Sequence, residues 1–134
     1  MSSRARTVYL DSSALVKLVV PEPETTALRA ELETWDRHVS SALVLTEVVR
    51  ACARVSSAAR RVAERVVASL DLIVIDDEIL NAAARLKPLE LRTFDAIHVA
   101  SAQMLGSALD AVIAYDTRLV QGAKAAKLTT IAPQ

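Results

Sequence analysis

The segment "TVYLDSSALVKLVV" (residues 7–20) decides the fold, because it predicts a buried strand that turns directly into a helix. "TVYL" has the β-branched and aromatic residues of a strand, and "SSALVKLVV" begins with hydroxyl side chains and continues as an apolar helix that Pro21 ends. Asp11 stands at the turn between these two apolar segments. Because burying an unpaired charge is costly, Asp11 must either cap the helix or hold a ligand.

Strand-like and helix-like segments alternate along the rest of the chain. Further strands are expected at residues 38–41, 71–76, 110–116 and 128–132. Helices are expected at residues 24–35, 42–55, 57–70, 77–87, 93–106 and 117–127, with Thr93 as an N-cap and Gly106 as a C-terminal stop. This alternation predicts an α/β fold, a single domain over residues 1–134, with a central and mainly parallel sheet flanked by helices on both faces.

The composition limits the classes of function. Aromatic residues make up only 3% of the chain, which argues against stacking platforms for single-stranded nucleic acid. Sixteen basic residues balance sixteen acidic ones, so any contact with nucleic acid must rely on a local patch. The single Cys52, the lack of a signal peptide and the lack of a membrane-length apolar run predict a soluble cytoplasmic protein that makes no membrane contact.

Four acids are expected at one edge of the predicted sheet. Asp11 and Asp116 each follow a strand, Asp95 lies in the first turn of a helix, and Glu47 lies in a largely apolar helix. Ligands of open α/β sheets bind at the carboxyl ends of the strands. Converging carboxylates repel one another, and Mg²⁺ or Mn²⁺ is the simplest neutralising partner for oxygen ligands. Such a metal lowers the pKa of bound water and stabilises charge on a phosphate, as phosphodiester hydrolysis requires.

Each acid also has a structural explanation. Asp11, Asp95 and Asp116 could cap helices, and Glu47 could pair with Arg50 three residues on. A phosphatase with Asp11 as nucleophile is disfavoured, because the expected second acid two residues on is replaced by serine. A receiver domain is disfavoured too, because it would need a paired acid near the first strand and a lysine that ends a late strand.

The segments "VYLDSSALVKL", "ALVLTEVVRA", "TFDAIHVASA" and "VIAYDTRL", in this order, resemble the motifs of the PIN domain, and most of all the VapC toxins of type II toxin–antitoxin systems. The resemblance implies a Mg²⁺- or Mn²⁺-dependent endoribonuclease, homodimeric and inhibited by a cognate VapB-like antitoxin. It implies an acidic centre of Asp11, Glu47, Asp95 and Asp116, with Asp11 and Asp95 in direct metal contact and Asp116 direct or through water. Glu47 would orient a metal-bound water or occupy a second metal site.

Two departures from the family pattern leave fewer possible metal ligands near Asp116. Many relatives have a serine or threonine where this chain has Ala114, and some carry a further acid where this chain has Thr117, Arg118 and Leu119. The resemblance therefore leaves a weaker second metal site, or a one-metal resting state, open.

Other side chains near the four acids could contact RNA phosphates. Arg118 is the best placed, and Lys17 and Arg92 are further candidates, with ordinary solvated charges as the alternative. His98 is interpreted as a packed polar residue and not as a ligand. A non-catalytic PIN-like module that binds RNA or protein, for instance through the basic helix around Arg60, Arg61 and Arg65, is the competing function.

Overall fold

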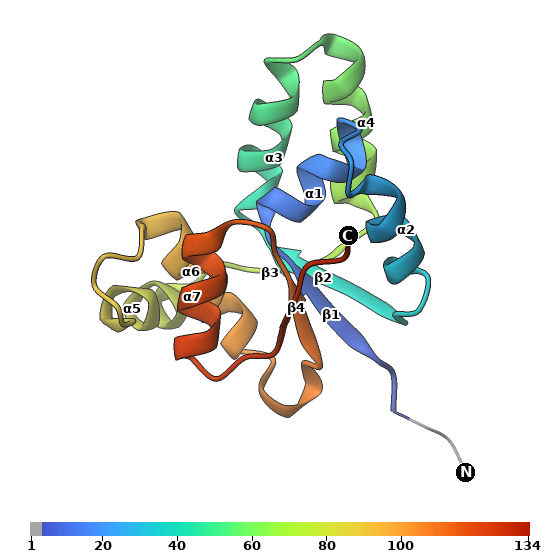
Figure 1. The fold of residues 1–134 in the computed structure, drawn as a ribbon. Coiled ribbons are helices and arrows are strands. Elements are labelled where there is room, and N and C mark those ends of the chain that lie inside the picture. Colours follow the sequence, from blue (N-terminus) through green and yellow to red (C-terminus); the bar gives the residue numbers. More distant parts are fainter. Residues whose placement is uncertain (1–3) are drawn as a thin grey trace.

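The computed structural model describes residues 4–134, which form five strands and seven α-helices (Figure 1). The strands are β1 (Thr7–Leu10), β2 (Arg37–Ser41), β3 (Asp71–Ile73), β4 (Ala111–Ile113) and β5 (Thr130–Ile131). The helices are α1 (Ser12–Val19), α2 (Thr25–Leu32), α3 (Val44–Ala53), α4 (Ser57–Ala68), α5 (Asp77–Arg85), α6 (Thr93–Gln103) and α7 (Thr117–Ala125). A short 3-10 turn, Gly106–Ala108, follows α6. The predicted α/β fold is confirmed.

All five strands are parallel and run in the spatial order β3-β2-β1-β4-β5. The central strand β1 pairs with β2 on one side and with β4 on the other. The strand order therefore reverses between β1 and β4, which is the place where open parallel sheets bind their ligands. Asp11 directly follows β1 and Asp116 lies three residues past β4, so both acids stand at this switch point.

Alternation of side chains along β1 separates two buried cores. Val8 and Leu10 pack with residues of helices α1 to α4 on one face of the sheet, and Tyr9 packs with residues of α6 and α7 on the other. The ribbon shows the same division, with α1, α3 and α4 above the sheet, α2 to its right and α5 to α7 to its left (Figure 1). Each fully buried aliphatic side chain contributes about 1.5–3 kcal/mol, so the two cores hold β1 in place from both faces.

Two local expectations were wrong. The continuous apolar run within residues 71–76 predicts a buried strand, but β3 ends at Ile73 and is only partly buried because it is an edge strand paired with β2 alone. Its apolar run continues into Val74, which is 75% exposed. Thr93 does not cap α6, because the helix begins at Thr93 itself and Arg92 at the cap position makes no capping hydrogen bond through its side chain.

Among residues 4–134, no helix is both long enough and apolar enough to cross a lipid bilayer.

Candidate active site

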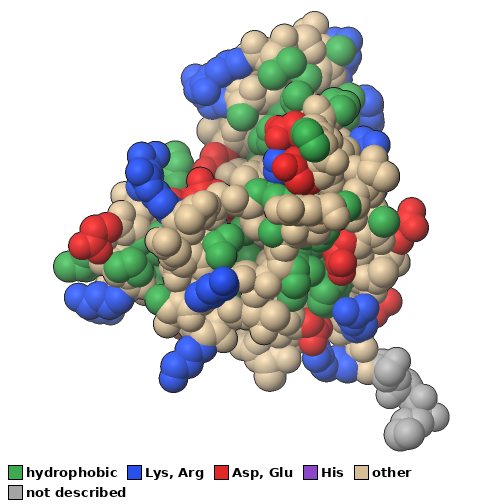
Figure 2. All heavy atoms as spheres, viewed as in Figure 1, with side chains coloured by type: hydrophobic (Ala, Val, Ile, Leu, Met, Phe, Trp, Pro, Cys, Tyr) green, Lys and Arg blue, Asp and Glu red, His purple; other side chains and the backbone are tan. Residues whose placement is uncertain are grey.

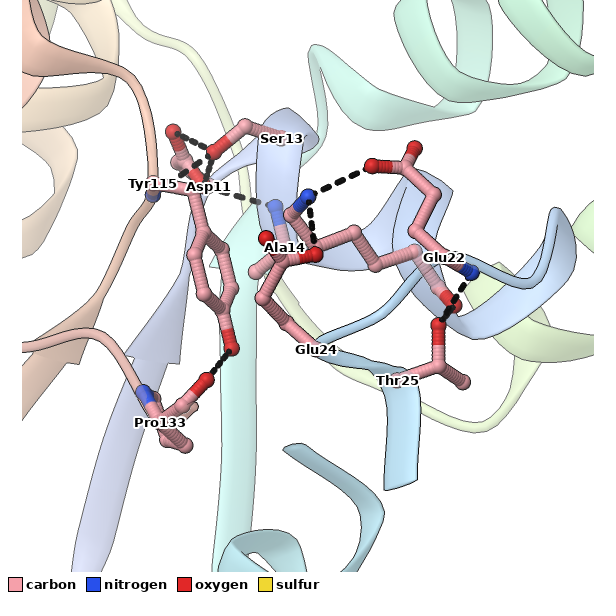
Figure 3. A network of polar contacts seen from close by, with 9 residues as sticks. Asp11, Ser13, Ala14, Glu22, Glu24, Thr25, Tyr115 and Pro133 are labelled. Atoms are coloured by element: carbon pink, nitrogen blue, oxygen red, sulfur yellow. Dashed lines mark hydrogen bonds and ion pairs between the residues drawn. The ribbon is translucent and has the colours of Figure 1, made fainter. Parts of the chain in front are cut away.

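Asp11 is the most buried of the four acids, with 1% of its surface exposed. It caps α1, because one carboxylate oxygen accepts a hydrogen bond of 3.0 Å from the backbone N–H of Ala14. The Ser13 hydroxyl lies 2.7 and 2.8 Å from the two oxygens of this carboxylate and donates to it (Figure 3). The same hydroxyl accepts from the backbone N–H of Tyr115 at 3.0 Å, so it joins the ends of β1 and β4. Asp11 therefore caps the helix, and of the two roles that the sequence allows for Ser12 and Ser13, capping the helix or hydrogen-bonding Asp11, Ser13 takes the second.

The ionisation of Asp11 is strongly perturbed. Burial raises the pKa of this carboxyl from 3.8 to about 6, and the nearby charge of Asp116 adds to the rise. The hydrogen bonds from Ser13 and Ala14 and the nearby His98 oppose it without cancelling it. The carboxylate at neutral pH is therefore held in an unfavourable environment that a cation would relieve.

Asp116 and Asp95 differ in whether their carboxylates make hydrogen bonds within the described part of the protein. Asp116 is exposed and caps α7, because its Oδ1 accepts from the backbone N–H of Leu119 at 3.1 Å. Asp95 is half-buried in the first turn of α6, and within residues 4–134 no hydrogen bond or ion pair engages its carboxylate. Burial raises the pKa of Asp95, and the charges of Asp116 and Glu47 raise it further. Helix capping therefore does not explain Asp95.

Glu47 is held by a buried chain of hydrogen bonds. The Nε2 of His98 donates to Glu47 Oε1 at 2.8 Å. The partner of Glu47 is therefore His98, whereas the sequence had suggested Arg50. The Tyr9 hydroxyl lies 2.7 Å from the Nδ1 of His98 and donates to it in the neutral imidazole. Burial raises the pKa of Tyr9, so its phenol keeps the proton that this bond needs. His98 is indeed packed, as predicted, but it also fixes an acid of the site.

All four acids line one pocket of about 470 Å³, here called the acidic pocket. Glu47, Asp95 and Asp116 also line a neighbouring pocket of about 360 Å³. This second one contains Arg92 and Arg118 and is here called the arginine pocket. The structure therefore brings together all four acids that the sequence singled out, from β1, α3, α6 and the start of α7.

The chemistry of the acidic pocket fits a hard divalent cation. The four acids that line it offer carboxylate oxygens as ligands, which is the ligand type that Mg²⁺ and Mn²⁺ prefer. Within residues 4–134, no Lys or Arg forms an ion pair with any of the four. As the side chains stand, no three acid, histidine or cysteine residues in that range form a finished metal-ligand cluster. Small side-chain rotations would therefore have to accompany cation binding.

Lys17 lines the acidic pocket, but its charge is already engaged. Its Nζ lies 2.7 Å from Glu22 Oε2 and 3.1 Å from Glu24 Oε2, and it also lies 4.7 Å from the centre of the Tyr115 ring. Figure 3 labels these three neighbours. The hydrogen bond with Glu22 is the main reason that the pKa of Lys17 is raised. This geometry does not favour the phosphate contact suggested for Lys17, and it fixes the wall of the pocket instead.

Arg92 and Arg118 are exposed in the arginine pocket, and within residues 4–134 neither forms an ion pair with the protein. Figure 2 shows basic side chains in separate groups around this face, with acidic side chains both near its middle and at its edges. The basic residues that line the arginine pocket are Arg92 and Arg118.

Ala114 is fully buried in the core shared with Tyr9 and the residues of α6 and α7. The hydroxyl that joins the ends of β1 and β4 in this chain comes from Ser13.

We expect Ser13→Ala to lower the free energy of unfolding by about 1–3 kcal/mol, because the variant leaves the Tyr115 N–H and the buried Asp11 carboxylate short of a partner. Urea denaturation of the metal-free protein would measure the loss. Ser12→Ala is the matched control, since Ser12 lines the same pocket and its hydroxyl makes no hydrogen bond within residues 4–134. Equal effects of the two substitutions would contradict the bridging role of Ser13.

Known proteins share both the sequence and the fold of this chain. The family model "PIN domain" matches residues 8–125. Ribonuclease VapC46 of Mycobacterium tuberculosis (strain ATCC 25618 / H37Rv) is 48% identical over 126 residues, covering 94% of this chain and 97% of that protein. Ribonuclease VapC35 of M. tuberculosis (strain CDC 1551 / Oshkosh) is 42% identical over 130 residues, covering 94% and 96% of the two proteins.

Two solved structures share the fold at low sequence identity. The crystal structure of M. tuberculosis VapC20, described as a sarcin-ricin loop cleaving toxin, superposes with a TM-score of 0.76 at 16% identity, covering 94% of this chain and 99% of that one. A chain of a toxin–antitoxin complex from Klebsiella pneumoniae superposes with a TM-score of 0.72 at 20% identity, covering 95% and 98%.

The parallel sheet, the carboxylate-lined pocket at its switch point and the match over residues 8–125 define one class of protein, and the chain belongs to the PIN domain family. Within that family it belongs with the VapC ribonucleases, the toxins of toxin–antitoxin systems. The predicted family and enzyme class are confirmed.

Proposed function

We propose that this VapC ribonuclease cuts RNA internally at a Mg²⁺ or Mn²⁺ centre held by Asp11, Asp95 and Asp116, with Glu47 beside it. The observation that carries the proposal is Asp95, a half-buried carboxylate with a raised pKa and with no capping, hydrogen-bonding or ion-pairing role within residues 4–134. A carboxylate that is costly to bury and that makes no contact that stabilises the fold is best explained by a role in a functional site.

The bound cation would supply an activated water and would offset negative charge on the phosphate. The residues of the chain position the reactants. Asp11 is fixed by Ser13 and Ala14, and Asp116 by the first turn of α7. His98 occupies one oxygen of Glu47, which leaves the other oxygen to orient the attacking water. Arg118 and Arg92 in the arginine pocket would bind the phosphates that flank the cut.

Binding of Mn²⁺ to the antitoxin-free protein tests the centre without a guess about the RNA. We expect calorimetry to show binding by the wild type and a loss of at least about tenfold in affinity for Asp95→Asn, since even outer-shell changes at metal sites cost 10–100-fold. Asp77→Asn is the matched control, because Asp77 also lies in the first turn of a helix but is exposed and lies outside both pockets.

Cleavage of a mixed RNA substrate should follow the same order, with Asp77→Asn active and Asp95→Asn inactive. Equal Mn²⁺ affinity in all three proteins would remove Asp95 from the centre. If none of them binds Mn²⁺, even with RNA present, the chain is a non-catalytic PIN-like module that binds RNA or protein.

We also propose a cognate VapB-like antitoxin and a homodimer as the partners of this chain. The support is its sequence likeness to the VapC ribonucleases and the resemblance of its fold to a chain of a toxin–antitoxin complex. Residues 1–134 acting as one PIN domain, and a cytoplasmic location, remain predictions.

A further inference from the structure

Phe94 is an exposed aromatic side chain directly beside the acids of the site. It is the single phenylalanine of the chain, it is 54% exposed, and it belongs to none of the three buried clusters. It lies in the first turn of α6, immediately before Asp95. Because the ring packs into none of these clusters, its exposed surface is available to a ligand that reaches the neighbouring pockets.

Phe94 stands between two hollows that both reach Glu47. One is the arginine pocket, and the other is a pocket of about 350 Å³ against α3, here called the α3 pocket. Glu47 and Phe94 line both of them. A chain-like ligand that crosses the acids from one pocket to the other would therefore pass over the face or edge of the Phe94 ring.

Arginines flank the ring on both sides. Arg92 and Arg118 line the arginine pocket, and Arg50 and Arg54 line the α3 pocket. All four are exposed, and within the described part of the chain none forms an ion pair. An exposed aromatic ring between pairs of unpaired guanidinium groups matches a single-stranded polynucleotide, whose bases stack on aromatic side chains and whose phosphates bind arginine.

We propose that Phe94 stacks against one unpaired base of the RNA next to the scissile phosphate, with Arg92 and Arg118 binding the backbone on one side and Arg50 and Arg54 on the other. The inference rests on the proposed ribonuclease function and adds to it a residue that positions the RNA beside the metal centre. The low aromatic content does not oppose it, because one ring suffices for one base. A paired base would already be stacked within its helix and could not cover the ring.

The test compares the affinities of variants for an unstructured 12-nucleotide RNA and for the same RNA annealed into a duplex. The Asp95→Asn background prevents cleavage. We expect Phe94→Ala to weaken binding of the single strand about tenfold or more and to leave binding of the duplex unchanged, while Phe94→Trp retains affinity. Fluorescence of the introduced tryptophan should be quenched by the single strand, measured against the background of Trp35. Leu89→Ala is the control, since Leu89 is 70% exposed and lies outside these pockets.

Two results would overturn the proposal. The first is that Phe94→Ala binds the single strand as tightly as the Leu89→Ala control does. If Phe94→Ala then weakens the binding of the antitoxin, the ring is a protein-docking residue. The second is an equal loss of single-strand and duplex affinity. Mn²⁺ binding by Phe94→Ala in the otherwise wild-type protein should stay unchanged, so failure of the stacking role and failure of the metal centre give different results.

Discussion

Asp11→Asn should abolish RNA cleavage and at the same time stabilise the metal-free protein. We expect the cleavage rate to fall at least about 100-fold, because loss of a direct ligand should exceed the 10–100-fold cost of losing an outer-shell partner. Asparagine keeps the shape of Asp11 and is itself a good N-cap, so the contact with the Ala14 N–H can persist. The substitution removes only the charge that burial penalises.

The gain in stability should depend on pH in a defined direction. Folding raises the pKa of Asp11 from 3.8 to about 6, so the folded chain binds this proton more tightly than the unfolded chain does. The stability of the wild type relative to Asp11→Asn therefore falls as the pH rises from about 4 to about 6. At about 1.4 kcal/mol per pKa unit, the full difference above pH 6 is at most about 3 kcal/mol.

Urea denaturation in EDTA at pH 4.5 and pH 7.5 would measure this difference, with Asp77→Asn as the control that shows no such change. Added Mn²⁺ should stabilise the wild type and not Asp11→Asn, because a ligand stabilises only the folded state that binds it. If Asp11→Asn is less stable than the wild type at pH 7.5 in EDTA, then the carboxylate serves the fold as a cap and the burial penalty is not the larger effect.

His98→Leu should slow RNA cleavage about 10–100-fold, the usual cost of losing an outer-shell partner, although His98 is a positioning residue that acts through Glu47. The variant should also be less stable by about 1–3 kcal/mol, because it leaves the buried hydroxyl of Tyr9 without this partner. Cleavage kinetics and urea denaturation measure the two effects separately.

The double variant Tyr9→Phe/His98→Leu separates positioning from stability. Replacing both partners of a buried hydrogen bond by apolar groups is often nearly neutral, so we expect most of the lost stability to return. Cleavage should remain slow, with kcat reduced more than KM is changed, because Glu47 still lacks its partner. Recovery of cleavage together with stability would mean that His98 serves the fold alone.

The sequence predicts the fold well because hydrophobic patterning and helix signals agree along most of the chain. It was wrong at β3, where a run of apolar residues looked buried although the strand lies at the edge of the sheet. An edge and a central strand can share one composition, and only the pairing of distant segments distinguishes them. The start of α6 was also predicted wrongly, because threonine is a residue type that often caps helices but Thr93 already lies inside this one.

The four acids could be selected from the sequence because the order of their segments places them at one edge of the sheet, and the structure brings them into one pocket. Their partners could not be selected in the same way. Tyr9 lies 89 residues from His98, and Ser13 lies 102 residues from Tyr115. The one local signal for His98 was its position three residues after Asp95, on the same side of α6.

Asp11 and Asp116 each serve the acidic pocket and also cap a helix, which affects where a gene for such a protein can first acquire an inactivating substitution. Both acids also begin helices, so their replacement by an apolar residue costs about 0.5–2 kcal/mol in lost capping. Asp95 caps nothing, so the fold tolerates its loss. Silenced descendants that still fold should therefore carry an inactivating change at Asp95, or an asparagine at Asp11 that keeps the cap, more readily than an apolar residue at Asp116, and such copies would keep the surface of the parent without its activity.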